Sequence, residues 1–169
     1  MKKLMSMFVM LASFGSASIY ADEQGAQIKF SGKVAVAPCS VETDSVLIDF
    51  GEFLTNSWDN SAKGKFIPTK IKLVNCPPYT NKVTALFTGE PDPQSPNYYK
   101  NKGSAKNVQI ELKEKGQAGE GLESGKKLTA DVKPDHTALF DLESRVNSEG
   151  KNATPGTIEG VVQVSFTYQ

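Results

Sequence analysis

The sequence predicts an all-β protein built as an antiparallel sandwich. Apolar and polar residues alternate with a period of two along most of the chain, as they do in strands that bury one face. No long run has the 3.6-residue period of an amphipathic helix. Stretches rich in Gly, Pro, Asn and Asp separate the alternating runs and are typical of loops. Many short strands joined by polar loops favour a sandwich.

The internal strands follow from this alternation. They are expected at residues 46–50, 66–74, 83–87, 108–112, 128–132 and 139–146. In the fourth of these, Val108, Ile110 and Leu112 share one face, and the polar residues between them share the other. Glycines Gly51 and Gly89 follow two of the runs and are expected to end them.

The chain begins with the features of a secretory signal peptide. Lys2 and Lys3 provide a positive start, residues 5–14 form a short apolar core, and small residues lead to a cleavage site after Ala21. The alternative, a membrane anchor, is disfavoured because the apolar stretch is shorter than the ~20 residues needed to span a bilayer. We therefore expect residues 1–21 to be removed on export, which leaves a soluble mature chain.

The charge balance argues against nucleic acid and anionic membranes as partners. The whole chain carries 19 basic and 19 acidic residues. Removal of the signal peptide takes away Lys2 and Lys3 and leaves 17 basic residues (19 − 2) against 19 acidic ones. A slightly acidic chain of about 148 residues cannot bind a polyanion through counterion release, and its length suits one domain.

The two cysteines, Cys39 and Cys76, are expected to form a structural disulfide in the oxidising compartment that export implies. A cross-link that closes a loop of about 38 residues adds roughly 4 kcal/mol in the chain-entropy model. A zinc site would need more ligands than these cysteines and the single histidine, His136, supply. We therefore expect no metal and no cofactor.

The two ends of the mature chain carry complementary apolar patterns. The apolar phase at the start contains Ala26, Ile28, Phe30, Gly32, Val34 and Val36. The apolar phase at the finish contains Ile158, Gly160, Val162, Val164, Phe166 and Tyr168. A long apolar edge strand is an aggregation hazard unless something covers it. The first strand either pairs with the last within one molecule or completes the sheet of a neighbouring copy, and the pattern alone fits both.

Short motifs along the mature chain resemble those of chaperone–usher pilins. In chain order they are Gly32-Lys33-Val34, Cys39-Ser40-Val41, Ile48-Asp49-Phe50-Gly51 and Leu73-Val74-Asn75-Cys76-Pro77. The ending resembles the family too, because Gly156 is the fourteenth residue from the C-terminus and Tyr168 is the penultimate one. The middle section, with Phe87-Thr88-Gly89, Tyr98-Tyr99-Lys100-Asn101 and residues 107–112, is similar to the minor tip adaptors of type 1 fimbriae.

The resemblance implies a fold and a set of site residues. Pilin domains of this kind are incomplete immunoglobulin-like sandwiches that lack their final strand and are completed by a donor strand. The implied organisation is a donor-strand extension at residues 22–36 followed by a pilin domain at residues 37–169. The implied donor residues are Ile28, Phe30, Gly32, Val34 and Val36. The implied residues of the groove and terminal strand are Gly156, Val162, Val164, Phe166 and Tyr168.

The resemblance also implies partners and a location. A periplasmic pilus chaperone fills the groove first, and at the outer-membrane usher the extension of the incoming subunit replaces it. The chain is then expected in an extracellular fimbrium, beside neighbouring pilin or adhesin subunits. The leading interpretation is a structural subunit that acts as a minor tip adaptor in cell adhesion. The alternatives are a major shaft subunit and a self-closed secreted immunoglobulin-like binding module.

Signals for catalysis or ligand binding are weak. His136 follows Asp135 in a polar loop context and is interpreted as a surface histidine, since acid–base catalysis needs a positioned partner. The motif spacings of serine hydrolases, zinc proteases and P-loops do not occur in the sequence. Trp58, Tyr98 and Tyr99 offer a sugar-stacking surface, but partial burial at the sheet ends is the simpler interpretation. The sequence therefore predicts no enzyme and no small-molecule substrate.

Overall fold

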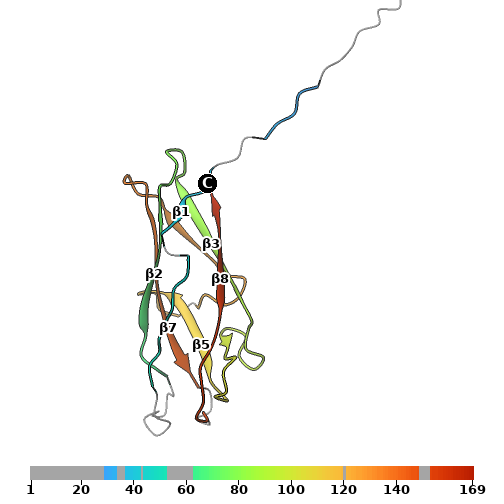
Figure 1. The fold of residues 1–169 in the computed structure, drawn as a ribbon, viewed down its shortest axis with the longest axis vertical. Coiled ribbons are helices and arrows are strands. Elements are labelled where there is room, and N and C mark those ends of the chain that lie inside the picture. Colours follow the sequence, from blue (N-terminus) through green and yellow to red (C-terminus); the bar gives the residue numbers. More distant parts are fainter. Residues whose placement is uncertain (1–28, 34–36, 43, 53–62, 120, 149–152) are drawn as a thin grey trace, which may run out of the picture. The chain divides into compact units, whose positions relative to one another are not determined.

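The computed structural model describes residues 29–33, 37–42, 44–52, 63–119, 121–148 and 153–169. The chain divides into two units, residues 1–33 and 34–169, and all of the strands that the structure describes lie in the second unit (Figure 1). No helix long and apolar enough to cross a membrane occurs in the described part of the chain.

The described residues of the second unit form two antiparallel sheets. The larger sheet has the strand order β1-β2-β7-β5-β4, and the smaller sheet has the order β6-β3-β8. The strands of the larger sheet are β1 (Ser40–Val41), β2 (Ile67–Val74), β7 (Ala138–Asn147), β5 (Gln109–Glu114) and β4 (Tyr99–Lys100). Those of the smaller sheet are β6 (Lys127–Asp131), β3 (Lys82–Gly89) and β8 (Val162–Tyr168). The prediction of an all-β antiparallel protein is confirmed.

The internal strand predictions agree with the structure with one exception. Residues 66–74, 83–87, 108–112, 128–132 and 139–146 correspond to β2, β3, β5, β6 and β7. Residues 46–50 alternate in sequence but form no named strand. A strand needs a neighbour with which to exchange hydrogen bonds, and these residues have no ladder partner within the described residues. Gly51, with φ of 70°, then turns the chain and donates its N–H to Asp49 Oδ1 at 2.8 Å.

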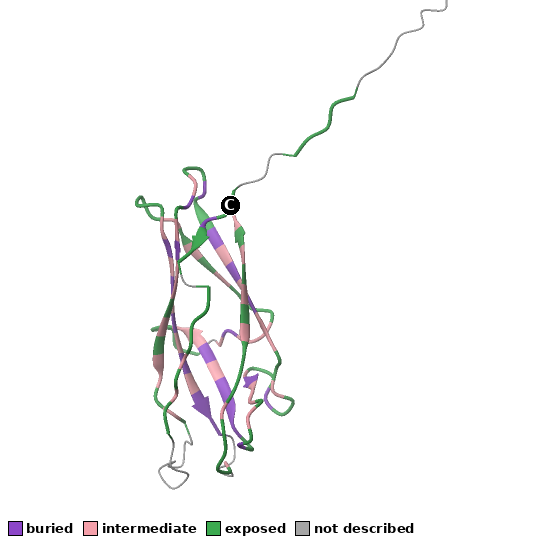
Figure 2. Ribbon diagram, in the orientation of Figure 1, coloured by how far each residue is buried: buried purple, intermediate pink, exposed green. Residues whose placement is uncertain are grey.

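The hydrophobic core lies between the two sheets and is built from alternate residues of their strands. In β7 the side chains of Ala138, Phe140 and Leu142 are buried, whereas the residues between them are half-buried. Phe87 of β3 and Phe140 are the largest fully buried side chains. The same alternation is visible as changes of colour along the strands in Figure 2. Apolar residues at every second position thus hold the two sheets together.

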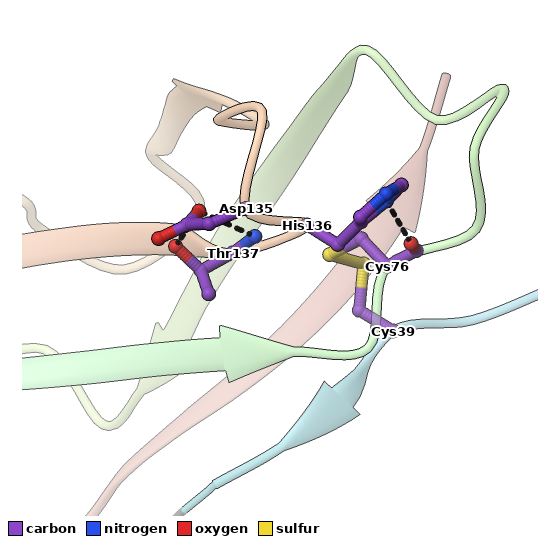
Figure 3. The surroundings of a disulfide bond; sticks show 5 residues. All are labelled: Cys39, Cys76, Asp135, His136 and Thr137. Atoms are coloured by element: carbon purple, nitrogen blue, oxygen red, sulfur yellow. Dashed lines mark hydrogen bonds between the residues drawn. A yellow bond between two sulfur atoms is a disulfide. The ribbon is translucent and has the colours of Figure 1, made fainter.

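A disulfide anchors the chain where it enters β1. Cys39 and Cys76 are joined, and both are buried in the main core cluster (Figure 3). The loop between β6 and β7 closes over this bond, because His136 Nδ1 lies 2.9 Å from the Cys76 carbonyl oxygen and the Cys76 N–H donates to the His136 carbonyl at 3.0 Å. Asp135 accepts hydrogen bonds from the backbone and the hydroxyl of Thr137. The exposed His136 therefore has a structural role in this loop.

Candidate functional site: the open edge of strand β8

Strand β8 lies at the edge of the smaller sheet and pairs only with β3 among the described residues. Its inward-facing side chains pack against the core but stay partly exposed; they are Val162, Val164, Phe166 and Tyr168. The cross-strand neighbours of the last three on β3, which are Phe87, Ala85 and Val83, are all 0% exposed. The core is therefore closed over β3 and open along β8.

Along the same edge, β8 has backbone hydrogen-bonding groups that no strand among the described residues pairs with. Lys82 and Gln169 exchange both of their backbone hydrogen bonds, Gln169 N–H to Lys82 oxygen at 2.9 Å and Lys82 N–H to Gln169 oxygen at 3.0 Å. In an antiparallel ladder such pairs alternate with pairs whose backbone groups point away from each other. The β8 residues that bond to β3 are therefore Gln163, Ser165 and Thr167. Those that direct their N–H and C=O groups to the free edge are Val162, Val164, Phe166 and Tyr168.

The same four residues thus provide the two things that an added strand would need, an apolar surface for its side chains and backbone partners for its hydrogen bonds. Their side chains leave the core partly open, and their backbone groups form a row of donors and acceptors on the side away from β3, where the described part of the chain supplies no strand. β8 carries no charged side chain over its seven residues, so nothing in its sequence discourages pairing. An extended segment that binds here would add main-chain hydrogen bonds and would bury alternate side chains in the core.

A pocket of about 770 Å³ lies beside the segment that leads into β8. One wall is residues 47–52 and the other is residues 153–159, with Ala105 and Val108 between them. Phe50 and Ile158 each pack against both core clusters and line this pocket. The pocket therefore continues the partly exposed apolar surface of β8 beyond the start of the strand.

Gly156 lies in the wall of this pocket, where the chain packs too closely for a side chain. A Cβ atom at this position would lie 2.3 Å from the backbone nitrogen of Ala105 and 2.6 Å from its Cα. Both neighbours are backbone atoms, so they could not move aside without shifting the loop that follows β4. The pilin-like glycine is thus explained by a close approach of two backbone segments.

The donor residues expected from the sequence are described only in part. Ile28, Val34 and Val36 lie outside the described residues. Phe30 is described and is 93% exposed, and no heavy atom lies within 4 Å of a Cβ placed on Gly32.

Burial is the main cause of the pKa shifts of two tyrosines at or near the site. Burial raises the pKa of the Tyr168 phenol above its ordinary value of 10.0. Burial, with a smaller contribution from Glu123, also raises the pKa of Tyr99, whose hydroxyl donates to the Leu122 carbonyl at 2.6 Å. Tyr99 is 2% exposed, so it offers no face for sugar stacking, and Trp58 lies outside the described residues.

The structure adds residues that the sequence did not single out as part of the site. Residues 46–50 were expected as an ordinary strand, whereas residues 47–52 form a wall of the pocket. Asn101 and Gly103 belong to the loop between β4 and β5, and they contact Thr157 in the opposite wall. The Asn-x-Gly spacing is a turn signal in sequence, but it does not indicate which segment the turn contacts.

This class of fold, a two-sheet sandwich with one open apolar edge, has clear relatives among known proteins. The family model described as Fimbrial protein matches residues 28–169. Protein FimG of Escherichia coli (strain K12) is 34% identical over 95% of both chains. The uncharacterized fimbrial-like protein YdeR of the same strain is 35% identical over the whole of both chains. The chain therefore belongs to the fimbrial protein family, the structural subunits of chaperone–usher pili.

Solved structures agree with this assignment at the level of the fold. The P pilus rod subunit PapA has a TM-score of 0.66 at 21% identity, with 79% of this chain and 100% of that chain covered. The P pilus adaptor subunit PapF has a TM-score of 0.51 at 17% identity, with 81% and 100% covered. Together with the open edge of β8, these similarities identify the fold as an incomplete immunoglobulin-like sandwich.

Proposed function

We propose that this fimbrial subunit polymerises by donating its N-terminal strand, residues 28–36, to the open edge of β8 in a neighbouring subunit. The observation that carries the proposal is the coincidence on β8 of half-buried inward side chains with outward-facing backbone groups. Donor residues Ile28, Phe30, Gly32, Val34 and Val36 would supply the missing alternation.

The energetics suit a durable contact. Full burial of one large apolar side chain stabilises by about 1.5–3 kcal/mol, and the four inward residues of β8 are already half-buried. Completing their burial and covering Phe30 therefore contributes on the order of 5 kcal/mol before ordering costs. A ladder of main-chain hydrogen bonds along seven residues adds register and slows withdrawal of the strand.

The role that we propose within the fimbria is a minor adaptor near the tip, which contributes to cell adhesion. The similarity to protein FimG over 95% of both chains supports this role. A major shaft subunit is the runner-up. The number of copies per fimbria separates the two, because an adaptor is rare and a shaft subunit is abundant.

The proposed route to the surface includes two transient partners. A periplasmic chaperone would cover the β8 edge after export, since the aggregation hazard of an apolar edge exists from the moment of folding. At the outer-membrane usher the strand of the next subunit would replace it. We assign the chain no catalytic activity and no cofactor.

Deletion of residues 22–36 tests the donation directly. The shortened chain keeps β8 and its pocket, so it should accept a strand from another subunit but should donate none. We expect it to appear only at the end of assembled chains when it is mixed with the intact subunit. Polymers made of the shortened chain alone, with the mass distribution of the intact protein, would contradict the proposal.

A further inference from the structure

The segment that leads into β8 has its own neighbour, which is the loop after β4. Strand β3 ends at Gly89, opposite Val162, so it offers no partner to the residues before that point. The loop takes over this position, because the Lys102 N–H donates to the Glu159 carbonyl at 2.7 Å and the Ala105 N–H donates to the Thr157 carbonyl at 3.1 Å. The chain before β8 therefore has a hydrogen-bonded neighbour on the same side as β8, although β3 has already ended.

The side chain of Asn101 lies at the centre of this contact. Its Nδ2 donates to the carbonyl oxygens of Ala105 at 2.9 Å and Thr157 at 3.2 Å. Its Oδ1 accepts from the backbone N–H groups of Gly103 at 2.9 Å and Glu159 at 2.8 Å. Both amide donors and the carbonyl oxygen are thus in use. The two backbone N–H donors identify Oδ1 and the two carbonyls identify Nδ2, so the orientation of the amide is fixed by its partners.

Close packing fixes the distance between the two segments. A Cβ atom on Gly103 would lie 2.1 Å from the Thr157 carbonyl oxygen. The Ser104 N–H donates to Thr157 Oγ1 at 3.0 Å, and the Thr157 N–H donates to Ser104 Oγ at 2.8 Å. Residue 157 therefore has its carbonyl, N–H and hydroxyl groups all bound to the loop.

The contact between the loop and residues 157 and 159 determines which way Ile158 faces. Thr157 and Glu159 use their backbone groups toward the loop, and Ile158 between them packs against both core clusters and lines the pocket. The inward and outward residues of this segment therefore alternate as they do in β8, where the even-numbered residues face the core. Asn101 itself does not line the pocket, so it influences the pocket through the lining residues that its amide contacts, which are Thr157 and Glu159 on one segment and Ala105 on the other.

We propose that Asn101 is a positioning residue that holds residues 157–159 in a strand-like conformation and so keeps the pocket open for an entering strand. The inference rests on the proposed function, since it concerns how fast the site accepts a strand. Without the amide, residues 157–159 would keep their hydrogen bonds to Lys102, Ser104 and Ala105 but would be held less firmly. Completing their order during binding has a cost, and a cost of this kind slows association. The bound strand would hold the segment in place, so dissociation would change less.

The test compares rates with stabilities. The purified full chain is mixed with a labelled peptide of its own residues 28–38, and association and dissociation are followed by stopped-flow fluorescence. The variants are N101A, which removes the amide, and N101D, which keeps the acceptor but sets a carboxylate against two carbonyl oxygens. We expect about tenfold slower association for both, the factor that corresponds to about 1.4 kcal/mol. The dissociation rate should change less than threefold.

The matched control is D135A. Asp135 also holds a loop through side-chain hydrogen bonds, but it lies between β6 and β7 beside the disulfide (Figure 3). Urea unfolding should show a similar loss of stability for D135A and N101A. Stopped-flow fluorescence should show slower peptide association for N101A and an unchanged association rate for D135A. Should N101A fail to fold, N101D carries the same comparison.

Two results would overturn the inference. Association of N101A and N101D at the rate of the unchanged chain, with stability lowered, would make Asn101 merely structural and would leave the proposed function intact. Failure of the unchanged chain to bind the peptide at all would overturn the inference together with the proposed function.

Discussion

The two outer strands of the smaller sheet, β6 and β8, share β3 as their neighbour but are very different edges. β6 has five residues and begins and ends with a charged side chain, Lys127 and Asp131. β8 has seven residues and no charged side chain. Short strands with charged residues are the usual protection against unwanted pairing. One edge of this sheet is therefore protected, and the other is left receptive.

The backbone strengthens this difference. The Val132 N–H donates to the Asn81 carbonyl at 2.8 Å, so the backbone groups of β6 that face its free edge belong to Lys127, Thr129 and Asp131. A strand approaching β6 would meet charged side chains at two of these three positions. On β8 the corresponding positions carry apolar side chains that point into the core. The two edges thus differ in the chemistry of their side chains, and this difference is the basis of our proposal that β8 and not β6 receives a strand.

The largest expected effect comes from a charge on the inner face of β8. V164K would place an ammonium group where a bound strand must exclude water, and burial of an unpaired charge is strongly unfavourable. We expect peptide affinity to fall by at least about 100-fold, roughly 2.7 kcal/mol. The matched control is Q163K, on the exposed face of the same strand, which should bind within about twofold. Equal losses in V164K and Q163K, measured by titration with the 28–38 peptide, would contradict the assignment of faces.

A smaller effect is expected from the removal of an aromatic ring. Phe166 lies 5.8 Å from Phe140, ring centroid to ring centroid, but it is only partly buried. F166A should therefore destabilise the free subunit by about 1–2 kcal/mol, less than the ~3–5 kcal/mol expected for F87A in the closed part of the core. Binding of the peptide should increase the loss in F166A and leave the loss in F87A unchanged. Urea unfolding with and without the peptide measures both, and identical behaviour of the two variants would remove the distinction between open and closed core.

The smallest effect concerns alkaline pH. Burial raises the pKa of Tyr168 above 10.0, so its contribution to stability is fully present below pH 10 and is lost as the pH rises through the folded-state value. A bound strand would bury this phenol further, and peptide affinity should therefore decline above pH 10. The peptide affinity of Y168F should decline less steeply with pH. The decline that remains would come from Tyr99, whose pKa is also raised by burial. Peptide affinity is measured for the two proteins between pH 9 and pH 11. The same decline with pH in both would show that no strand covers Tyr168.

Alternation in the sequence was enough to predict most of the strands and the residues that face the core. It identified β2, β3, β5, β6 and β7 within a few residues, because each has a clear period of two and lies in a paired sheet. It failed for residues 46–50, which have the pattern but no ladder partner among the described residues. Periodicity records which side of a segment is apolar; it does not record whether a neighbouring strand is present.

The candidate site was predictable only in part for a related reason. The sequence alone predicts which residues of the last strand are on its apolar face, for example Val164 and Phe166. Which edge of β8 is free depends on the register between Lys82 and Gln169, which is a tertiary feature. The support from Asn101 depends on a contact 56 residues away in sequence, at Thr157, and no local pattern reveals it.

Hydrogen exchange along β8 tests the central claim most directly. In the free subunit, the amides of Ser165 and Thr167 should exchange slowly because they bond to β3, and those of Val164 and Phe166 should exchange fast because they face the free edge. Addition of the 28–38 peptide should protect Val164 and Phe166 and should leave Ser165 and Thr167 nearly unchanged. Protection of all four amides before the peptide is added would show that the edge is already covered. No new protection after saturation with the peptide would show that β8 does not receive the strand.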